Sequence, residues 1–292
     1  MKKNYIGRFA PSPSGPLHFG SLVAAVGSYL QAKSNSGKWL VRMEDLDPPR
    51  EVVGAADNIL RTLEAFHLFW DDNVMYQSQR HHAYQHQIDT WLQQGIAYFC
   101  QCTRKTIKQS GGFYQGTCRD LALTDNHRAV RLKMNHPVES FSDLKQGTIL
   151  INPPLAHEDF IIKRSDGLFA YNLAVVIDDI EQGITEVVRG ADLIEPTGRQ
   201  ISLYHQLGFA EIRYLHLPLA VDDSNNKLSK QNHAPAIDMR DKRQTLLQVF
   251  SFLGMPVDNS LKHLDLEQIL QWGVENWRIS TLPNESKITL PF

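Results

Sequence analysis

A histidine and a glycine stand at the start of a predicted helix near the beginning of the chain. The segment before them is rich in proline, which excludes a helix there because proline fixes φ and lacks the amide proton. From Phe19 onward, apolar residues recur at helical spacing. A helix start offers free amides and the positive end of the helix dipole, so His18, Gly20 and Ser21 form a candidate phosphate site. An ordinary strand-to-helix turn explains the spacing equally well.

Three cysteines gather in one short segment, at Cys100, Cys102 and Cys118. An odd number of thiols cannot all pair within one chain, and clustered thiols favour a structural zinc site. Zinc normally takes four ligands, so one more donor is needed. Ordinary ligand chemistry nominates His127, because imidazole is a common zinc donor. The alternative is that the cysteines are three small buried hydrophobic residues.

Strands and helices must hold these groups in place, and the first part of the chain alternates between the two. A strand is predicted from Lys38 to Glu44, where it ends in a run of acids, and an amphipathic helix follows from Val52 to Phe66. Acids at the carboxyl end of a strand stand where open α/β sheets bind ligands. Alternating strands and helices of this kind favour a parallel, doubly wound sheet.

Further elements are predicted along the rest of the chain. Ala174 to Ile177 is a nearly continuous apolar run, as in a strand buried on both faces, and it ends in Asp178 and Asp179. Asp222 to Pro235 is polar and predicts a loop. The other predicted elements are helices at 80–94 and 201–207, strands at 129–134, 160–163, 186–189 and 215–221, and a helical tail from Arg243.

Composition limits the class of protein. The chain has 292 residues, 42% of them hydrophobic, and a net charge of −2, so any contact with nucleic acid must come from a local basic patch. The first residues contain no apolar segment of the kind found in signal peptides. No apolar run is long enough to cross a membrane. We therefore expect a cytoplasmic protein without a membrane span.

Four motifs occur in series. They are Arg8–Ser21 (R-F-A-P-S-P-S-G-P-L-H-F-G-S), Arg42–Asp47 (R-M-E-D-L-D), Tyr171–Asp179 (Y-N-L-A-V-V-I-D-D) and Lys227–Gln231 (K-L-S-K-Q). The first and last resemble the "HIGH" and "KMSKS" signatures of class I synthetases, and the series resembles the glutamyl-tRNA synthetases. The chain ends soon after the last motif, where ordinary members continue into an anticodon-binding region. With the clustered cysteines, this shortness resembles the glutamyl-Q tRNA(Asp) synthetases.

The resemblance implies a fold. It is an α/β fold with a Rossmann-like, doubly wound parallel sheet in two halves, an inserted zinc-containing unit and a small helical appendage at the C-terminus. We place the halves at 1–76 and 165–232, the inserted unit at 77–164 and the appendage at 233–292. The resemblance also implies Tyr114 as the fourth zinc ligand, in place of His127.

The resemblance further implies the binding residues. Glutamate carries two carboxylates and one ammonium, so Arg8 and Arg189 are the candidate carboxylate forks and Glu44 is the candidate partner of the ammonium. The full glutamate-binding set is Arg8, Phe9, Ala10, Pro11, Ser12, Glu44, Tyr171 and Arg189. The ATP-binding set is His18, Gly20, Ser21, Lys227 and Lys230, of which His18 and Lys230 are the catalytic candidates. Val175 stands where many glutamyl-tRNA synthetases have asparagine.

The implied activity has two steps. The α-carboxylate of L-glutamate attacks the α-phosphate of ATP, with Mg²⁺ assisting, and a hydroxyl on tRNA then takes the glutamyl group. For the glutamyl-Q tRNA(Asp) synthetases that hydroxyl belongs to queuosine in the anticodon of tRNA(Asp). Two alternatives stay open: an ordinary glutamyl-tRNA synthetase that charges the tRNA 3' end, and a non-catalytic tRNA-binding relative. We expect a monomer.

Overall fold

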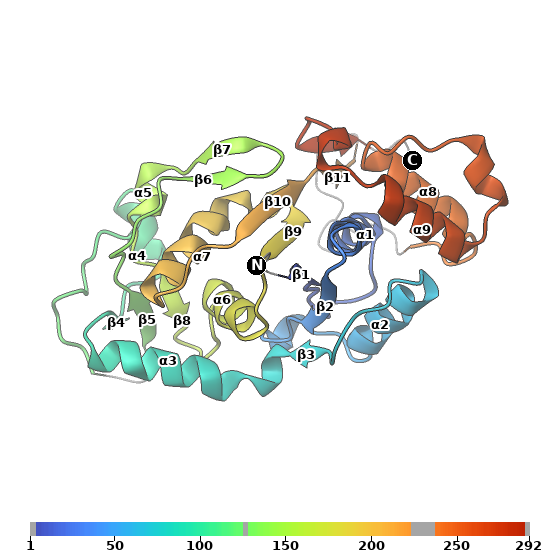
Figure 1. Cartoon of the computed structure of the whole chain (residues 1–292). Coiled ribbons are helices and arrows are strands. Elements are labelled where there is room, and N and C mark those ends of the chain that lie inside the picture. The colour runs from blue at the N-terminus through green and yellow to red at the C-terminus, as the bar shows by residue number, and fades with distance from the viewer. Residues whose placement is uncertain (1–3, 125–127, 223–236, 290–292) are drawn as a thin grey trace.

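The computed structural model describes residues 4–124, 128–222 and 237–289. A parallel sheet lies in the middle of the molecule, with an antiparallel unit on one side and the C-terminal helices on the other (Figure 1). Strands β1 (Ile6–Phe9) and β2 (Lys38–Met43) are parallel, and helix α1 (Phe19–Ser34) connects them. Strand β3 (Met75–Tyr76) pairs with β2. The predicted succession of strand, turn, helix and strand is confirmed.

The second half of the sheet is built around β10 (Arg213–Leu217), which lies parallel to β9 (Glu186–Gly190) on one side and to β6 (Ser140–Asp143) on the other. The two halves meet between β1 and β9. There the Thr185 amide donates to the Ile6 carbonyl over 2.9 Å, and the Ile6 amide donates to Thr185 Oγ1 over 3.0 Å. The α/β class with a parallel sheet is thus confirmed.

The apolar run after Tyr171 is a helix, and the predicted strand at 174–177 is wrong. Helix α6 (Tyr171–Glu181) is buried around most of its circumference, including Val175, Asp178 and Asp179. A continuous apolar run does not distinguish a buried strand from a buried helix, because both need apolar residues on every side. Helix α7 (Ile194–Gln206) begins earlier than the predicted 201–207.

The inserted segment carries its own antiparallel sheet of β4 (Ala97–Cys100), β5 (Ala129–Leu132) and β8 (Ile161–Lys163). The remaining elements of the segment are α3 (His81–Gln93), α4 (Arg104–Gln109), α5 (Pro153–Ala156), and strand β7 (Gly147–Leu150), which forms a hairpin with β6. The division of the chain at 76 and 164 remains a prediction. The hairpin β6–β7 crosses it, because β6 pairs with β10 of the central sheet.

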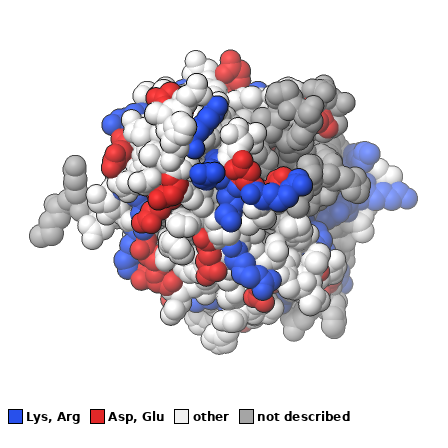
Figure 2. All heavy atoms as spheres, turned by 90° about the vertical axis from the view of Figure 1, so that its right-hand side faces the viewer, with Lys and Arg blue, Asp and Glu red and all other residues white. Residues whose placement is uncertain are grey.

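The C-terminal segment packs on the first helix. Helices α8 (Lys242–Phe252) and α9 (Leu266–Asn276) share one apolar core with α1, and strand β12 (Lys287–Thr289) pairs with β11 (Leu219–Val221). Helix α2 (Ala55–Ala65) also joins this core. Figure 2 views the molecule from this side, where basic and acidic side chains of the described residues are interspersed. A mixed surface of this kind does not attract nucleic acid as a single basic patch would.

A buried chain of polar side chains connects the C-terminal segment with the central sheet. Trp277 Nε1 donates to Gln31 Oε1 over 2.6 Å, and Gln31 Nε2 donates to Glu186 Oε1 over 2.6 Å. The Tyr5 hydroxyl donates to the same Glu186 oxygen over 3.1 Å. This series of hydrogen bonds therefore runs from the end of α9, across α1, to the start of β9.

In the described ranges, no helix is both long and apolar enough to cross a bilayer.

Candidate functional site

The candidate ligand-binding groups lie where the parallel strands end. Arg8 is near the carboxyl end of β1, Glu44 directly follows β2, and Arg189 is near the end of β9. Ligands of open α/β sheets bind at this edge. The proline-rich loop between β1 and α1 is held to the segment after β2, because the Glu44 amide donates to the Pro11 carbonyl over 2.9 Å.

Two of the arginines share one carboxylate. Asp179 accepts from Arg8 Nε over 3.0 Å and from Arg42 Nη1 over 2.8 Å, and all three side chains are buried. Burial raises the pKa of Asp179, but the Arg42 and Arg8 guanidinium groups outweigh this effect and lower the pKa overall. Arg8, predicted as a fork for a ligand carboxylate, therefore already has a carboxylate partner within the chain.

Glu44 is nearly buried and incompletely paired. Its side chain is 10% exposed, and Oε1 lies 3.7 Å from Arg42 Nη2. Within the described part of the chain, Glu44 Oε1 and Arg42 Nη2 both lack a hydrogen-bond partner. Burial raises the pKa of Glu44 to about 7, although Arg42 and Arg8 act in the opposite direction. A buried carboxylate oxygen without a donor is unfavourable, so this position suits a ligand that brings a cation.

Arg189 is buried among neutral groups. Its Nε donates to His216 Nε2 over 3.2 Å, its Nη1 to Gln200 Oε1 over 2.8 Å, and its Nη2 to Thr197 Oγ1 over 2.7 Å and to the Leu193 carbonyl over 3.1 Å. Among the described residues, no carboxylate forms an ion pair with it. A buried cation without a counter-charge suits an anionic ligand.

His18 caps the first helix. Its Nδ1 accepts from the Ser21 amide over 3.2 Å, and its backbone is extended as N-cap residues require. A neutral imidazole that accepts at Nδ1 carries its proton on Nε2, so this edge can donate. Gly20 and Ser21 lie in the first turn of α1, where the amides and the helix dipole favour an anion.

The remaining predicted residues fall into four groups. The hydroxyl of Tyr171 lies among Glu44, Arg189 and Arg8, whose charges all act on its pKa, although the residue as a whole is 36% exposed. The Phe9 ring instead points into the core, where it stacks on Trp39. Ala10, Pro11 and Ser12 form the loop next to the site. Lys227 and Lys230 lie outside the described residues.

Sequence reasoning gave no role to Arg42, Asp178 and Asp179. Asp178 is fully buried and accepts from Gln77 Nε2, Arg80 Nε and the Tyr84 hydroxyl. A usable signal was present in the sequence. An arginine inside the apolar strand K-W-L-V-R-M, and two acids inside an apolar run, must be buried and therefore need partners.

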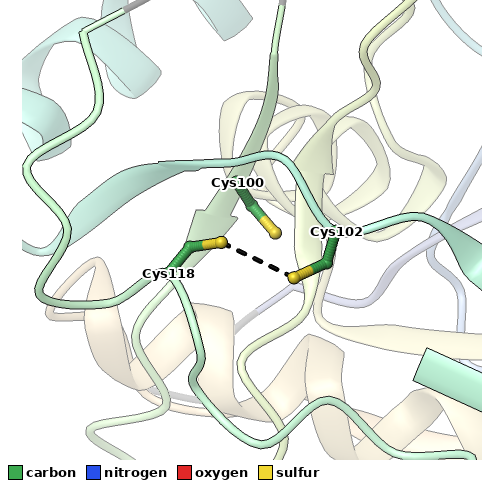
Figure 3. A group of neighbouring side chains, drawn as sticks. All are labelled: Cys100, Cys102 and Cys118. Carbon is green, nitrogen blue, oxygen red and sulfur yellow. Dashed lines mark hydrogen bonds between the residues drawn. The ribbon is translucent and has the colours of Figure 1, made fainter. Parts of the chain in front are cut away.

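The three cysteines come together as predicted. Their sulfur atoms all lie within 4.8 Å of one another, and Cys102 Sγ lies 3.6 Å from Cys118 Sγ (Figure 3). Two thiolates on one tetrahedral zinc stand about 3.8 Å apart, given Zn–S bonds of about 2.3 Å. Burial and the neighbouring Cys118 and Cys100 raise the pKa of Cys102 to about 12. Burial also raises the pKa of Cys118, but hydrogen bonds from the Gln101 backbone and from neighbouring side chains outweigh burial and lower the pKa overall, so the cluster holds one thiol that ionises readily beside one that does not. Metal binding requires thiolates, and a bound cation would stabilise all three, so the set fits a metal.

Tyr114 lies beside this cluster. Its hydroxyl accepts from the Cys118 amide over 2.7 Å, and its ring is buried under the Arg131 guanidinium, 3.7 Å from the ring centroid. Arg131 Nε also donates to Cys100 Sγ over 3.2 Å. The phenol oxygen is thus within reach of the thiols. His127, the other candidate for the fourth ligand, lies outside the described residues.

Comparison with known proteins defines the class. The family model of the "tRNA synthetases class I (E and Q), catalytic domain" matches residues 6–276. The fold is similar to a glutamate-tRNA synthetase from Elizabethkingia anophelis, with a TM-score of 0.80 at 22% identity over 98% of this chain and 68% of that one. A glutamate tRNA ligase from Elizabethkingia meningosepticum gives 0.79 at 22% identity over 98% and 67%. Fold and matched residues define a class I aminoacyl-tRNA synthetase.

Curated relatives narrow the class. A protein of Vibrio vulnificus (strain YJ016) is 64% identical over 99% of this chain and 95% of its own length. A protein of Photobacterium profundum is 65% identical over 98% and 93%, and one of Escherichia coli O6:H1 is 56% identical over 99% and 94%. Each is named "Glutamyl-Q tRNA(Asp) synthetase". The chain belongs to this family and is a ligase of the aminoacyl-tRNA synthetase type.

Proposed function

We propose that the chain activates L-glutamate with ATP and transfers it to queuosine in the anticodon of tRNA(Asp). The observation that carries the amino-acid part is the buried Arg189 without a carboxylate partner among the described residues, together with the buried Glu44 Oε1 that lacks a hydrogen-bond donor. A glutamate carboxylate complements Arg189, and the glutamate ammonium complements Glu44 Oε1. With Glu44 ionised, Arg8, Arg42 and Arg189 outnumber Asp179 and Glu44 by one charge, and glutamate carries one net negative charge. The names of the relatives support queuosine of tRNA(Asp) as the acceptor.

The first chemical step needs positioning and charge stabilisation more than a covalent nucleophile. ATP enters as its magnesium complex, and its phosphates approach the amides at the start of α1 and His18. An oxygen of the glutamate α-carboxylate attacks the α-phosphorus. The bond from this phosphorus to the bridging oxygen breaks, and pyrophosphate leaves with the electron pair. We assign Lys230, which lies outside the described residues, to the same phosphates by sequence alone.

The second step forms an ester. A hydroxyl of the queuosine cyclopentenediol attacks the glutamyl carbonyl, the bond to the adenylate breaks, AMP leaves, and the hydroxyl proton passes to solvent. Arg189 and Glu44 hold the glutamyl group during this transfer, which keeps its carbonyl oriented toward the incoming nucleotide. We further propose that the protein acts in the cytoplasm, as a monomer.

We also propose that Cys100, Cys102, Cys118 and Tyr114 hold one structural Zn²⁺. The thiol separations support the three sulfur ligands, and the buried position of Tyr114 supports the fourth. A structural zinc would tie β4 to the loop that carries Cys118, since the four ligands come from the two ends of this segment.

Replacing Cys102 by serine is expected to remove the zinc, because a hydroxyl is a poor substitute for a thiolate ligand. Elemental analysis should give about one zinc per wild-type chain and much less per variant, with faster proteolysis between β4 and β5. Tyr114→Phe keeps all three thiols and is the matched variant. Weaker zinc retention in Tyr114→Phe supports the phenol ligand, whereas full retention assigns the fourth position elsewhere. Absence of zinc from the purified wild-type protein would contradict the proposed zinc site.

The acceptor is tested by locating the glutamate on the tRNA. Radiolabelled glutamate, ATP and queuosine-containing tRNA(Asp) are incubated with the enzyme, and the tRNA is cut by ribonuclease. Label is expected in the anticodon fragment, because queuosine lies at the first anticodon position. Label on the 3'-terminal adenosine would instead identify an ordinary glutamyl-tRNA synthetase. If no label enters the tRNA and the enzyme also fails to exchange pyrophosphate, the chain is a non-catalytic relative.

A further inference from the structure

His216 occupies the middle of the second half-sheet and has no part in the reaction described above. It lies in β10, 1% exposed, between β6 and β9 (Figure 1). On one side it faces Asp143, the last residue of β6, and on the other it stands opposite Arg189 in the β9–β10 pairing. The three side chains therefore form a line across the sheet from Asp143 to Arg189.

The hydrogen bonds fix the tautomer of this histidine. Arg189 Nε can only donate, so His216 Nε2, at 3.2 Å, must accept and carries no proton. The single proton of the neutral ring then lies on Nδ1, which donates to Asp143 Oδ2 over 2.8 Å. The same oxygen accepts from the His216 amide over 3.0 Å. The carboxylate thus selects the form of the ring that can accept from Arg189.

Asp143 is itself tightly held. Its Oδ1 accepts from the amides of Lys145 and Gln146, each over 2.9 Å, at the turn of the β6–β7 hairpin. Burial raises the pKa of Asp143, but the hydrogen bonds from His216 and from these two amides outweigh it and lower the pKa overall. The carboxylate therefore stays ionised and acceptor-only, as the Nδ1–H tautomer of His216 requires.

We propose that His216 and Asp143 are positioning residues for Arg189: the Asp143 carboxylate holds His216 as the Nδ1–H tautomer, and His216 Nε2 fixes the guanidinium in the plane in which it receives a substrate carboxylate. Gln200 Oε1 accepts from Nη1, and Thr197 Oγ1 and the Leu193 carbonyl accept from Nη2, so all three nitrogens are held and one N–H of Nη1 is left for the substrate carboxylate. The proposal rests on the proposed role of Arg189 in glutamate binding and names the groups that orient it.

The charges around the ring agree with a neutral histidine. Burial lowers the pKa of His216, and the charge of Arg189 lowers it further. Asp143 and the Leu193 carbonyl act in the opposite direction, and the net change is downward. The other described groups around the ring are neutral, namely the Leu193 carbonyl, Thr197 Oγ1 at 3.3 Å and the rings of Tyr214 and Phe141. A protonated ring would place a second donor and a like charge against Arg189, so the positioning works only with the neutral form.

The tautomer is read directly by nitrogen NMR of histidine-labelled protein. The wild-type His216 ring is expected to give the Nδ1–H pattern, with Nε2 unprotonated. In Asp143→Asn, an amide NH₂ facing the ring donates to Nδ1 and moves the proton to Nε2, where it opposes the Arg189 Nε–H. We expect the Nε2–H pattern in this variant. An Nε2–H pattern in the wild type would overturn the proposal whether or not glutamate is the substrate.

The functional consequence is read by pyrophosphate exchange. His216→Leu is expected to raise the KM for glutamate by about tenfold, because a hydrogen bond to a charged group is lost, with the KM for ATP little changed. His216→Gln can offer an amide oxygen in the place of Nε2, so it should recover a large part of this loss. Glu139→Gln alters an exposed glutamate that contacts His157, and it serves as the control with unchanged kinetics.

The outcomes distinguish a failure of the positioning role of His216 from a failure of the proposed function. An unchanged glutamate KM in folded His216→Leu overturns the positioning role, as does an equal rise in the KM for ATP. Failure of the wild type to exchange pyrophosphate with glutamate overturns the proposed function instead, and the NMR pattern still reports whether Asp143 sets the tautomer. Thermal melting of each variant shows whether it is folded.

Discussion

A tRNA(Asp) transcript made without modified nucleosides is expected to accept no glutamate from this enzyme, whereas queuosine-containing tRNA(Asp) is charged efficiently. The two RNAs share the 3'-terminal diol, but only the second has the cyclopentenediol that the proposed second step uses as nucleophile. Proteins read RNA sequence chiefly in unpaired loops, where bases can leave the stack, and the anticodon is such a loop. The expected difference is therefore all-or-none rather than a change in affinity.

The measurement is incorporation of radiolabelled glutamate into acid-precipitable RNA. Pyrophosphate exchange in the same mixtures serves as the control, because it reports adenylate formation and does not use the acceptor hydroxyl. Periodate treatment cannot replace the transcript, since it destroys both diols. Charging of the unmodified transcript at its 3' end would contradict the proposed acceptor and support an ordinary glutamyl-tRNA synthetase.

Arg189→Met is expected to lower kcat/KM for glutamate by about 10²- to 10³-fold, because it removes a buried cation that pairs with a substrate carboxylate. The effect should appear mainly as a higher KM for glutamate, with the KM for ATP nearly unchanged. Arg189→Lys keeps the charge but loses the planar fork, so an intermediate loss is expected. Pyrophosphate exchange at varied glutamate and ATP measures all three quantities.

The matched control is Arg240→Met. Arg240 has a side chain that is 91% exposed and pairs only with nearby Asp238 among the described residues, so its loss should leave the kinetics unchanged. Arg8 is a different case. Its removal would leave the buried Asp179 short of a partner, and we attribute to Arg8 a loss of stability as well as of binding. Unchanged glutamate kinetics in folded Arg189→Met would contradict the proposed pocket.

The elements that sequence reasoning placed correctly are those with a local signal. The strand and helix around His18 are marked by prolines and by apolar spacing, and the structure confirms both. The cysteine cluster was equally visible, because all three residues lie close together in the chain. Helix α6 was mistaken for a strand because its apolar run is short and buried on nearly every side.

Other parts of the site depend on contacts between distant residues and carry no local signal. Asp179 meets Arg8 across 171 positions of the chain, and Asp143 meets His216 across 73. The hairpin that carries Asp143 belongs by sequence to the inserted segment, yet it extends the central sheet. Such pairings follow from the crossing of chain segments in the fold, which propensities and periodicity do not specify.

The hydrogen bonds from Trp277 through Gln31 to Glu186 affect how the protein unfolds. If α9 frayed from the carboxyl end, Trp277 would leave, and the buried Gln31, which also holds Glu186, would lose the donor to its Oε1. Opening the tail alone is therefore costly, and its amides should exchange with solvent only when those of α1 and β9 do. We therefore expect the C-terminal helices to unfold together with β9, the strand that carries Arg189, rather than to move as a separate hinged module.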